Sequence, residues 1–148
     1  MSLLIHTYRY GESGARPGLS IGVTRHPPRG IPRTEYASRG YFQVWLPLLG
    51  PSAPLLAAIR RGSLSFETFA RRYRTEMNRP EPRQVIRLLA FLARRKRLNL
   101  GCYCADASRC HRTLLAALIE AEVRNDAPVE PEAPSFASPA CSMPEIED

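Results

Sequence analysis

Three cysteines lie within nine residues of one another in the segment "GCYCADASRCHR", residues 101–112. They are Cys102, Cys104 and Cys110, and the third is followed directly by His111 and Arg112. A deprotonated thiol is a nucleophile or a metal ligand, an imidazole carries protons or binds metals, and a guanidinium binds anions. This segment is therefore the first place to look for chemistry.

Two familiar kinds of cysteine site fit the spacing poorly. A zinc site would use Cys102, Cys104, Cys110 and His111, but these residues lack the paired C-x₂₋₄-C ligands of zinc modules. Neighbouring helical residues also point about 100° apart, so Cys110 and His111 would not face one ion if both were helical. A phosphatase-type loop has the pattern Cys-x₅-Arg, whereas four residues separate Cys104 from Arg109 and six separate Cys102 from Arg109. The spacing therefore predicts neither a metal site nor a phosphatase loop.

An anion-binding turn fits better. The pattern predicts a helix from Arg109 to about Val123, which Asp106 or Ser108 can cap. Residues 110–112 then lie in its first turn. A helix N-terminus presents free N–H groups and a partial positive charge, which bind anions and favour a thiolate.

The roles within this turn follow from the residue types. Cys110 is the predicted nucleophile, His111 the neighbouring proton carrier, and Asp106 a further acid/base group. Cys102 and Cys104 lie at the end of a predicted strand, and we expect both to be small buried hydrophobes.

The charge is distributed unevenly along the chain. Residues 1–124 carry 21 basic and eight acidic residues, a net charge of +13, and 20 of those bases are arginine. Residues 125–148 carry six acids and no base. A GC-rich genome would account for the use of arginine in place of lysine without any functional meaning. The surplus of positive charge favours an anionic partner: nucleic acid, a nucleotide or another phosphorylated compound.

Strand-like and helix-like segments alternate, which is typical of an α/β domain with a largely parallel sheet. The sequence therefore predicts a single Rossmann-like layered domain over residues 1–124. The predicted strands are 3–10, 19–24, 41–46 and 98–104, and the predicted helices are 52–60, 66–77, 82–95 and 109–123. The proline-rich segment 25–33, "RHPPRGIPR", is expected to be irregular.

Composition also bears on location. The N-terminus does not resemble a signal peptide, and the longest apolar region, residues 44–59, contains three prolines and is too short to span a bilayer. Four cysteines without an export signal do not indicate a disulfide framework. We expect a cytoplasmic protein with reduced thiols, no membrane contact, and a disordered Pro/Glu-rich tail over residues 125–148.

Several blocks of the chain resemble one family. The "CYC…CHR" segment followed by an apolar helix is similar to the family called domain of unknown function 488. The blocks "TRHPPRG" (24–30), "VWLPLLGPS" (44–52) and "SFETFARRYRTEM" (65–77) resemble that family's blocks in the same order, so the resemblance covers about residues 19–122. It implies a compact α/β domain in which the Arg-Pro loop lies near the Cys-His-Arg turn, and it implies no settled activity.

The chain departs from this family at two positions. Family members often carry an acid where this chain has Gln43, and a glutamate near the position of Ala105. If those acids act as acid/base groups in relatives, this chain would use Asp106 in their place or would lack the activity.

The leading functional hypothesis is a pocket for a phosphorylated small molecule, most plausibly a nucleotide, with thiol or acid/base chemistry at the Cys-His-Arg turn. The anion would be neutralised by four arginines: Arg25, Arg29, Arg109 and Arg112. The alternative is a non-catalytic nucleic-acid-binding module that uses the basic surface. Neither a cofactor, nor enzymatic activity, nor an oligomeric state follows from the sequence.

Overall fold

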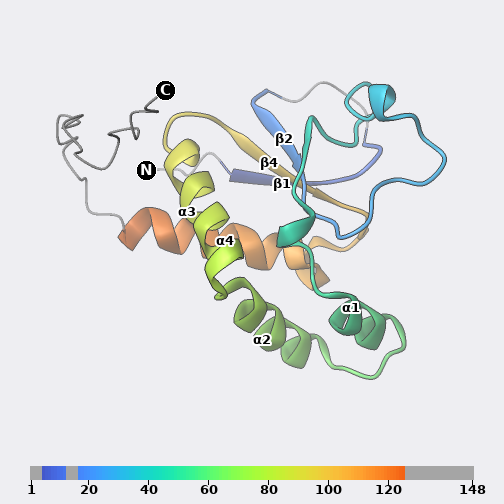
Figure 1. Cartoon of the computed structure of the whole chain (residues 1–148), viewed down its shortest axis with the longest axis vertical. Coiled ribbons are helices and arrows are strands. Elements are labelled where there is room, and N and C mark those ends of the chain that lie inside the picture. The colour runs from blue at the N-terminus through green and yellow to red at the C-terminus, as the bar shows by residue number, and fades with distance from the viewer. Residues whose placement is uncertain (1–4, 13–16, 126–148) are drawn as a thin grey trace, which may run out of the picture.

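A computed structural model describes residues 5–12 and 17–125 (Figure 1). The tail predicted over residues 125–148 lies, except for its first residue, outside the described residues. Within the described part of the chain, no helix is long and apolar enough to cross a membrane.

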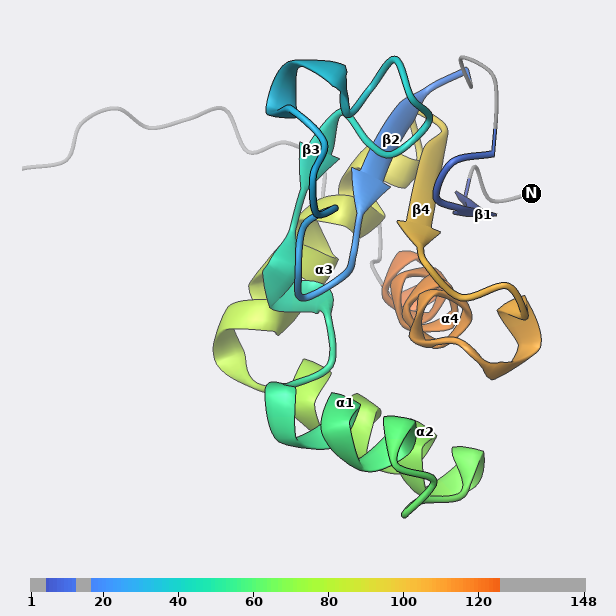
Figure 2. The same ribbon diagram turned by 90° about the vertical axis from the view of Figure 1, so that its right-hand side faces the viewer.

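The sheet has four strands, all parallel, in the order β1-β4-β2-β3. Their bounds are Ile5–Arg9 (β1), Leu19–Gly22 (β2), Val44–Trp45 (β3) and Leu98–Cys102 (β4). This confirms the predicted α/β class with a parallel sheet. In Figure 2 the arrows of β2 and β4 point the same way, so their carboxyl ends meet at one edge of the sheet.

The central strand β4 is the most buried, and all five of its residues are shielded from solvent. It is shorter than predicted, because the neighbouring strands end where it ends. Arg9 of β1 pairs with Cys102, and Gly22 of β2 pairs with Gly101. With no neighbouring strand beyond that level, Cys104 lies in the following loop.

Four α-helices accompany the sheet. They are Ala53–Arg60 (α1), Phe66–Met77 (α2), Pro80–Ala93 (α3) and His111–Asn125 (α4), and a short 3₁₀ turn, Ala107–Arg109 (η3), precedes the last of them. Ser52 and Ser65 cap α1 and α2, since each side chain accepts a hydrogen bond from a backbone N–H three residues later. The helix predicted from Pro82 begins two residues earlier, because Pro80 is well accommodated in a first helical turn.

The two faces of the sheet are covered differently. Helices α3 and α4 pack on one face, where Leu98 and Leu100 join the main apolar core (Figure 2). The other face is covered by an aromatic cluster built around Tyr8, Tyr10 and Phe42. Helices α1 and α2 lie beyond the carboxyl ends of β2 and β4, so they close one side of that edge.

Candidate functional site

A pocket of about 240 Å³ lies at the carboxyl edge of the sheet, between the ends of β2 and β4 and the helices α1 and α2. This is the position at which ligands bind in open α/β sheets. Its lining consists of Thr24, Arg25, His26, Pro51, Leu56, Ile59, Arg60, Phe69, Cys102, Tyr103, Cys104, Arg109, Cys110 and His111.

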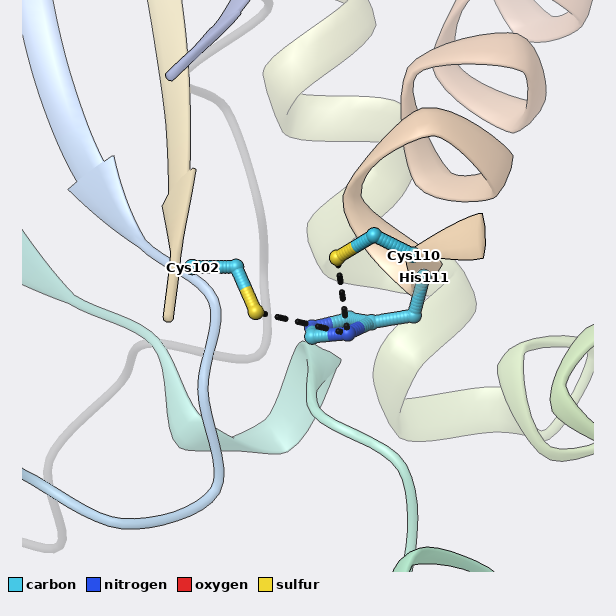
Figure 3. Close-up of side chains that lie close together, drawn as sticks. All are labelled: Cys102, Cys110 and His111. Carbon is cyan, nitrogen blue, oxygen red and sulfur yellow. Dashed lines mark hydrogen bonds between the residues drawn. The ribbon is translucent and has the colours of Figure 1, made fainter. Parts of the chain in front are cut away.

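Two thiols and one imidazole form the floor of this pocket (Figure 3). Cys102 ends β4, whereas Cys110 and His111 lie at the start of α4. The Nδ1 atom of His111 is 3.9 Å from the Sγ atom of Cys102 and 3.8 Å from the Sγ atom of Cys110. These three atoms lie within 4.8 Å of one another, and all three residues are buried.

The orientation of the His111 ring is set from its far side. Its Nε2 atom is 2.7 Å from the carbonyl oxygen of Val23, just after β2, so Nε2–H donates to that oxygen. Nδ1 is then left with a free lone pair directed at the two sulfur atoms. Burial lowers the pKa of His111, and the ring of Tyr73 packs edge-on against it with centroids 5.5 Å apart. The imidazole is therefore held neutral and in a single orientation.

The prediction that Cys110 lies in the first turn of the helix is wrong. Cys110 has extended backbone angles, φ −132° and ψ 145°, and α4 begins at the next residue. Its carbonyl oxygen accepts the N–H of Thr113, which makes it the residue that precedes the first turn. The 100° rule for two helical neighbours does not apply, so Cys110 and His111 can face one point. The sequence argument against a metal site loses its geometric basis.

The expected burial of the cysteines is right for Cys102 and wrong for Cys104. Cys104 is exposed in the loop after β4, and its Sγ atom is 3.8 Å from that of Cys102. Cys110, expected to be the reactive thiol, is only 1% exposed. Of these three sulfur atoms, that of Cys104 is the one open to solvent.

The three thiols differ in acidity because they share hydrogen bonds. Hydrogen bonds from Cys102 and then Cys110 hold the pKa of Cys104 far below its usual range. The hydrogen bond with Cys104 is the main cause that raises the pKa of Cys102 to about 11. The hydrogen bond with Cys102 is likewise the main cause that raises the pKa of Cys110. Negative charge in the cluster is therefore favoured on the exposed sulfur.

Arg112 is placed differently from the predicted anion ligand. Its side chain is only 3% exposed, and it does not line the pocket. Nη1 donates to the carbonyl oxygen of Cys104 over 2.7 Å, and the buried Nε has no hydrogen-bond partner. Arg112 therefore holds the Cys104 loop against the start of α4.

The other predicted site residues divide into two groups. Arg25 and Arg109 line the pocket, whereas Arg29 does not. Asp106 caps the turn η3, where its carboxylate accepts the N–H and the hydroxyl of Ser108. Those hydrogen bonds lower the pKa of Asp106, and the residue does not line the pocket.

Two basic residues of the pocket were missed by the sequence reasoning. His26 follows Arg25 in the irregular loop, and Arg60 lies in the last turn of α1. His26 could have been proposed, because it neighbours a predicted ligand in a loop that follows a strand. Arg60 carries no local signal, since only the packing of α1 over the ends of the strands brings it to the site.

Comparison with known families gives a match over most of the chain. The model of DUF488-N3a, described as the active DUF488-N3 subclade, matches residues 5–123. No curated protein and no solved structure matches the chain. The chain therefore belongs to the DUF488 family, as its sequence blocks predicted.

Proposed function

We propose that this member of the DUF488 family binds a phosphorylated small molecule in its pocket, between the Cys-His cluster and α1. The single observation that carries the proposal is the charge around the pocket. Arg25, Arg60 and Arg109 come from three separate elements and all line it, whereas among the residues that the structure describes no aspartate or glutamate does.

These arginines lack ion-pair partners in the part of the chain that the structure describes. In residues 5–12 and 17–125, none of the three guanidinium groups forms an ion pair with a carboxylate. Convergent arginines without acidic partners favour a ligand that brings several negative oxygen atoms, as a phosphate does. A carboxylate ligand would satisfy fewer of these donors.

The rest of the wall limits the size and character of the ligand. The pocket also has apolar lining residues, which come from α1 and α2: Leu56, Ile59 and Phe69. Typical small-molecule pockets measure roughly 300–1,000 Å³, so about 240 Å³ suits a compact molecule better than a dinucleotide. A phosphorylated sugar or a mononucleotide with its base partly outside the pocket matches both features.

The proposal includes chemistry at the floor of the pocket. The description of the matching subclade as active favours a catalytic role for the site. Cys104 is the exposed sulfur of the cluster, and His111 lies behind it with an unprotonated Nδ1. The nucleophilic or acid/base role predicted for Cys110 is therefore assigned to the Cys104–His111 side of the cluster, because Cys104 is the most exposed of the three thiols that line the pocket.

Binding can be tested with defined probes. Inorganic phosphate, pyrophosphate and nucleoside 5′-monophosphates are titrated into the full-length protein by isothermal calorimetry at several salt concentrations. We expect saturable binding of one probe per chain, with a weak dependence on salt. No heat with any of these probes, at protein concentrations that detect millimolar dissociation constants, would contradict the proposal.

A second candidate, binding to nucleic acid, rests on a different surface. Arg71, Arg74 and Arg83 line a groove formed by α2, α3 and α4, away from the thiols. Binding to duplex DNA through such residues should weaken steeply with salt, with a slope near −0.9 for each phosphate contact. Titration with duplex DNA over the same salt concentrations therefore separates the two functions.

A further inference from the structure

The sulfur–imidazole cluster has the composition and geometry of a metal centre, and we infer that it is a zinc site. Its buried ligands are Cys102, Cys110 and the Nδ1 atom of His111, and the exposed Cys104, whose Sγ atom is 3.8 Å from that of Cys102, would supply the fourth. Zinc binding by these groups does not depend on what the pocket above them binds.

The distances match a tetrahedral ion. Zinc lies about 2.3 Å from a thiolate sulfur and about 2.0–2.1 Å from an imidazole nitrogen, so tetrahedral ligands lie about 3.8 Å apart for two sulfurs and about 3.5 Å for sulfur and nitrogen. The Sγ atoms of Cys102 and Cys104 are 3.8 Å apart, and Nδ1 of His111 is 3.9 Å from Cys102 and 3.8 Å from Cys110. The Sγ atoms of Cys102 and Cys110 lie within 4.8 Å of each other, so these two sulfurs would approach by up to about 1 Å as the site closes on the ion.

The ligand histidine already has the support that metal-bound histidines need. Such residues donate their second ring N–H to a carbonyl or a carboxylate, which fixes the tautomer and the direction of the ring. In His111 the Nε2–H donates to Val23, so Nδ1 carries no proton. Figure 3 shows the sulfur atoms of Cys102 and Cys110 directed at this ring. The contact with Tyr73 fixes the ring from a further side.

The charge of the surroundings favours a negative centre at this place. Arg112 is 3% exposed, and within the described residues no carboxylate pairs with it. An unpaired buried guanidinium is costly. Zinc with three thiolates and a neutral imidazole carries a net charge of −1, and Arg112 lies beside Cys104, since its Nη1 donates to the carbonyl oxygen of that residue over 2.7 Å. The metal centre and Arg112 therefore neutralise each other.

The ligand types select the metal. Thiolates with an imidazole favour zinc over magnesium, calcium or manganese, which prefer oxygen ligands. Three ligands are buried and the fourth opens to the pocket, so water or a ligand oxygen can replace Cys104 at the ion. Zinc at this position would occupy Nδ1 of His111 and act on a bound molecule as a Lewis acid, so it would take the place of the acid/base chemistry proposed above for the metal-free Cys104–His111 pair.

The test measures the metal directly. The full chain carrying Cys141→Ser, which removes the tail thiol, is purified without chelators and its zinc is measured by inductively coupled plasma mass spectrometry. We expect one zinc ion per chain, the same as in the unsubstituted protein. Zinc should be lost from Cys102→Ser, Cys110→Ser and His111→Gln, and retained with weaker affinity in Cys104→Ser.

A second measurement covers variants that fail to fold. The unsubstituted protein is stripped of metal under reducing conditions and titrated with Co²⁺, which should give thiolate-to-cobalt charge-transfer absorption that saturates at one ion per chain. X-ray absorption on the zinc form should show sulfur and nitrogen neighbours in a ratio of three to one.

Three outcomes would overturn the zinc site. They are an absence of bound zinc together with no cobalt–thiolate absorption, a disulfide between Cys102 and Cys104 in the freshly purified protein in place of metal, and loss of the metal on Cys141→Ser. Arg60→Ala should keep its zinc, so failure of phosphate binding and failure of metal binding are told apart.

Discussion

Replacing Arg60 by alanine tests whether the cationic side of the pocket binds an anion. The guanidinium lines the pocket from the last turn of α1 and has no carboxylate partner in the described part of the chain. A hydrogen bond to a charged group contributes roughly 1.5–3 kcal/mol when it is shielded from water. Because Arg60 is exposed, we discount this to about 1–1.4 kcal/mol, which corresponds to a five- to tenfold weaker dissociation constant for a phosphate probe.

Arg61→Ala is the matched control. Arg61 is also an exposed arginine at the end of α1, but it does not line the pocket. Both changes remove one positive charge from the same end of the helix, so a long-range charge effect would weaken binding equally. Isothermal titration with pyrophosphate at fixed salt should show the loss for Arg60→Ala and no loss for Arg61→Ala. Equal affinities for the two single variants would refute the assignment of Arg60 to the site.

Three further changes test the fold and the cluster. Gly101→Ala should lower the free energy of unfolding by about 1–3 kcal/mol in urea, because an added Cβ would overlap a tyrosine ring packed on β4, and an unchanged urea midpoint would show that the aromatic layer yields easily. Ser65→Ala should cost about 1 kcal/mol through loss of the α2 cap, whereas Ser63→Ala, two residues earlier, should cost little in the same denaturation assay. In metal-free, reduced protein carrying Cys141→Ser, iodoacetamide should label Cys104 before Cys102 and Cys110, as measured by peptide mass mapping. Faster labelling of either buried thiol would contradict the exposure of Cys104 in the loop after β4.

Much of the fold could be predicted because its signals are local. The stripe of Phe69, Tyr73 and Met77 recurs at helical spacing, and these residues are buried on α2 as that spacing requires. The capping serines before α1 and α2 were visible for the same reason, since a cap and its helix are neighbours in the chain. The alternation of strand and helix segments likewise indicated a parallel sheet before any contact was known.

The end of β4 was harder to predict, because a strand ends where its partners end. The composition of residues 98–104 allows an extended segment through Cys104, but pairing stops at Cys102, opposite Arg9 of β1. That register is a property of three chain segments far apart in the sequence. It decides which of two similar cysteines is buried and which is exposed.

The sequence by itself determined the residues that carry chemistry, the excess of positive charge and the family. The tertiary structure decided how those residues are used. The extended backbone at Cys110 turns its thiol toward the same point as His111, Val23 fixes the free nitrogen of that ring, and the packing of α1 brings Arg60 to the pocket. The spacing of residues along a chain predicts the direction of their side chains only within one regular helix or strand. The contacts of His111 and Arg60 join separate elements, and Cys110 lies where the helical backbone has not yet begun.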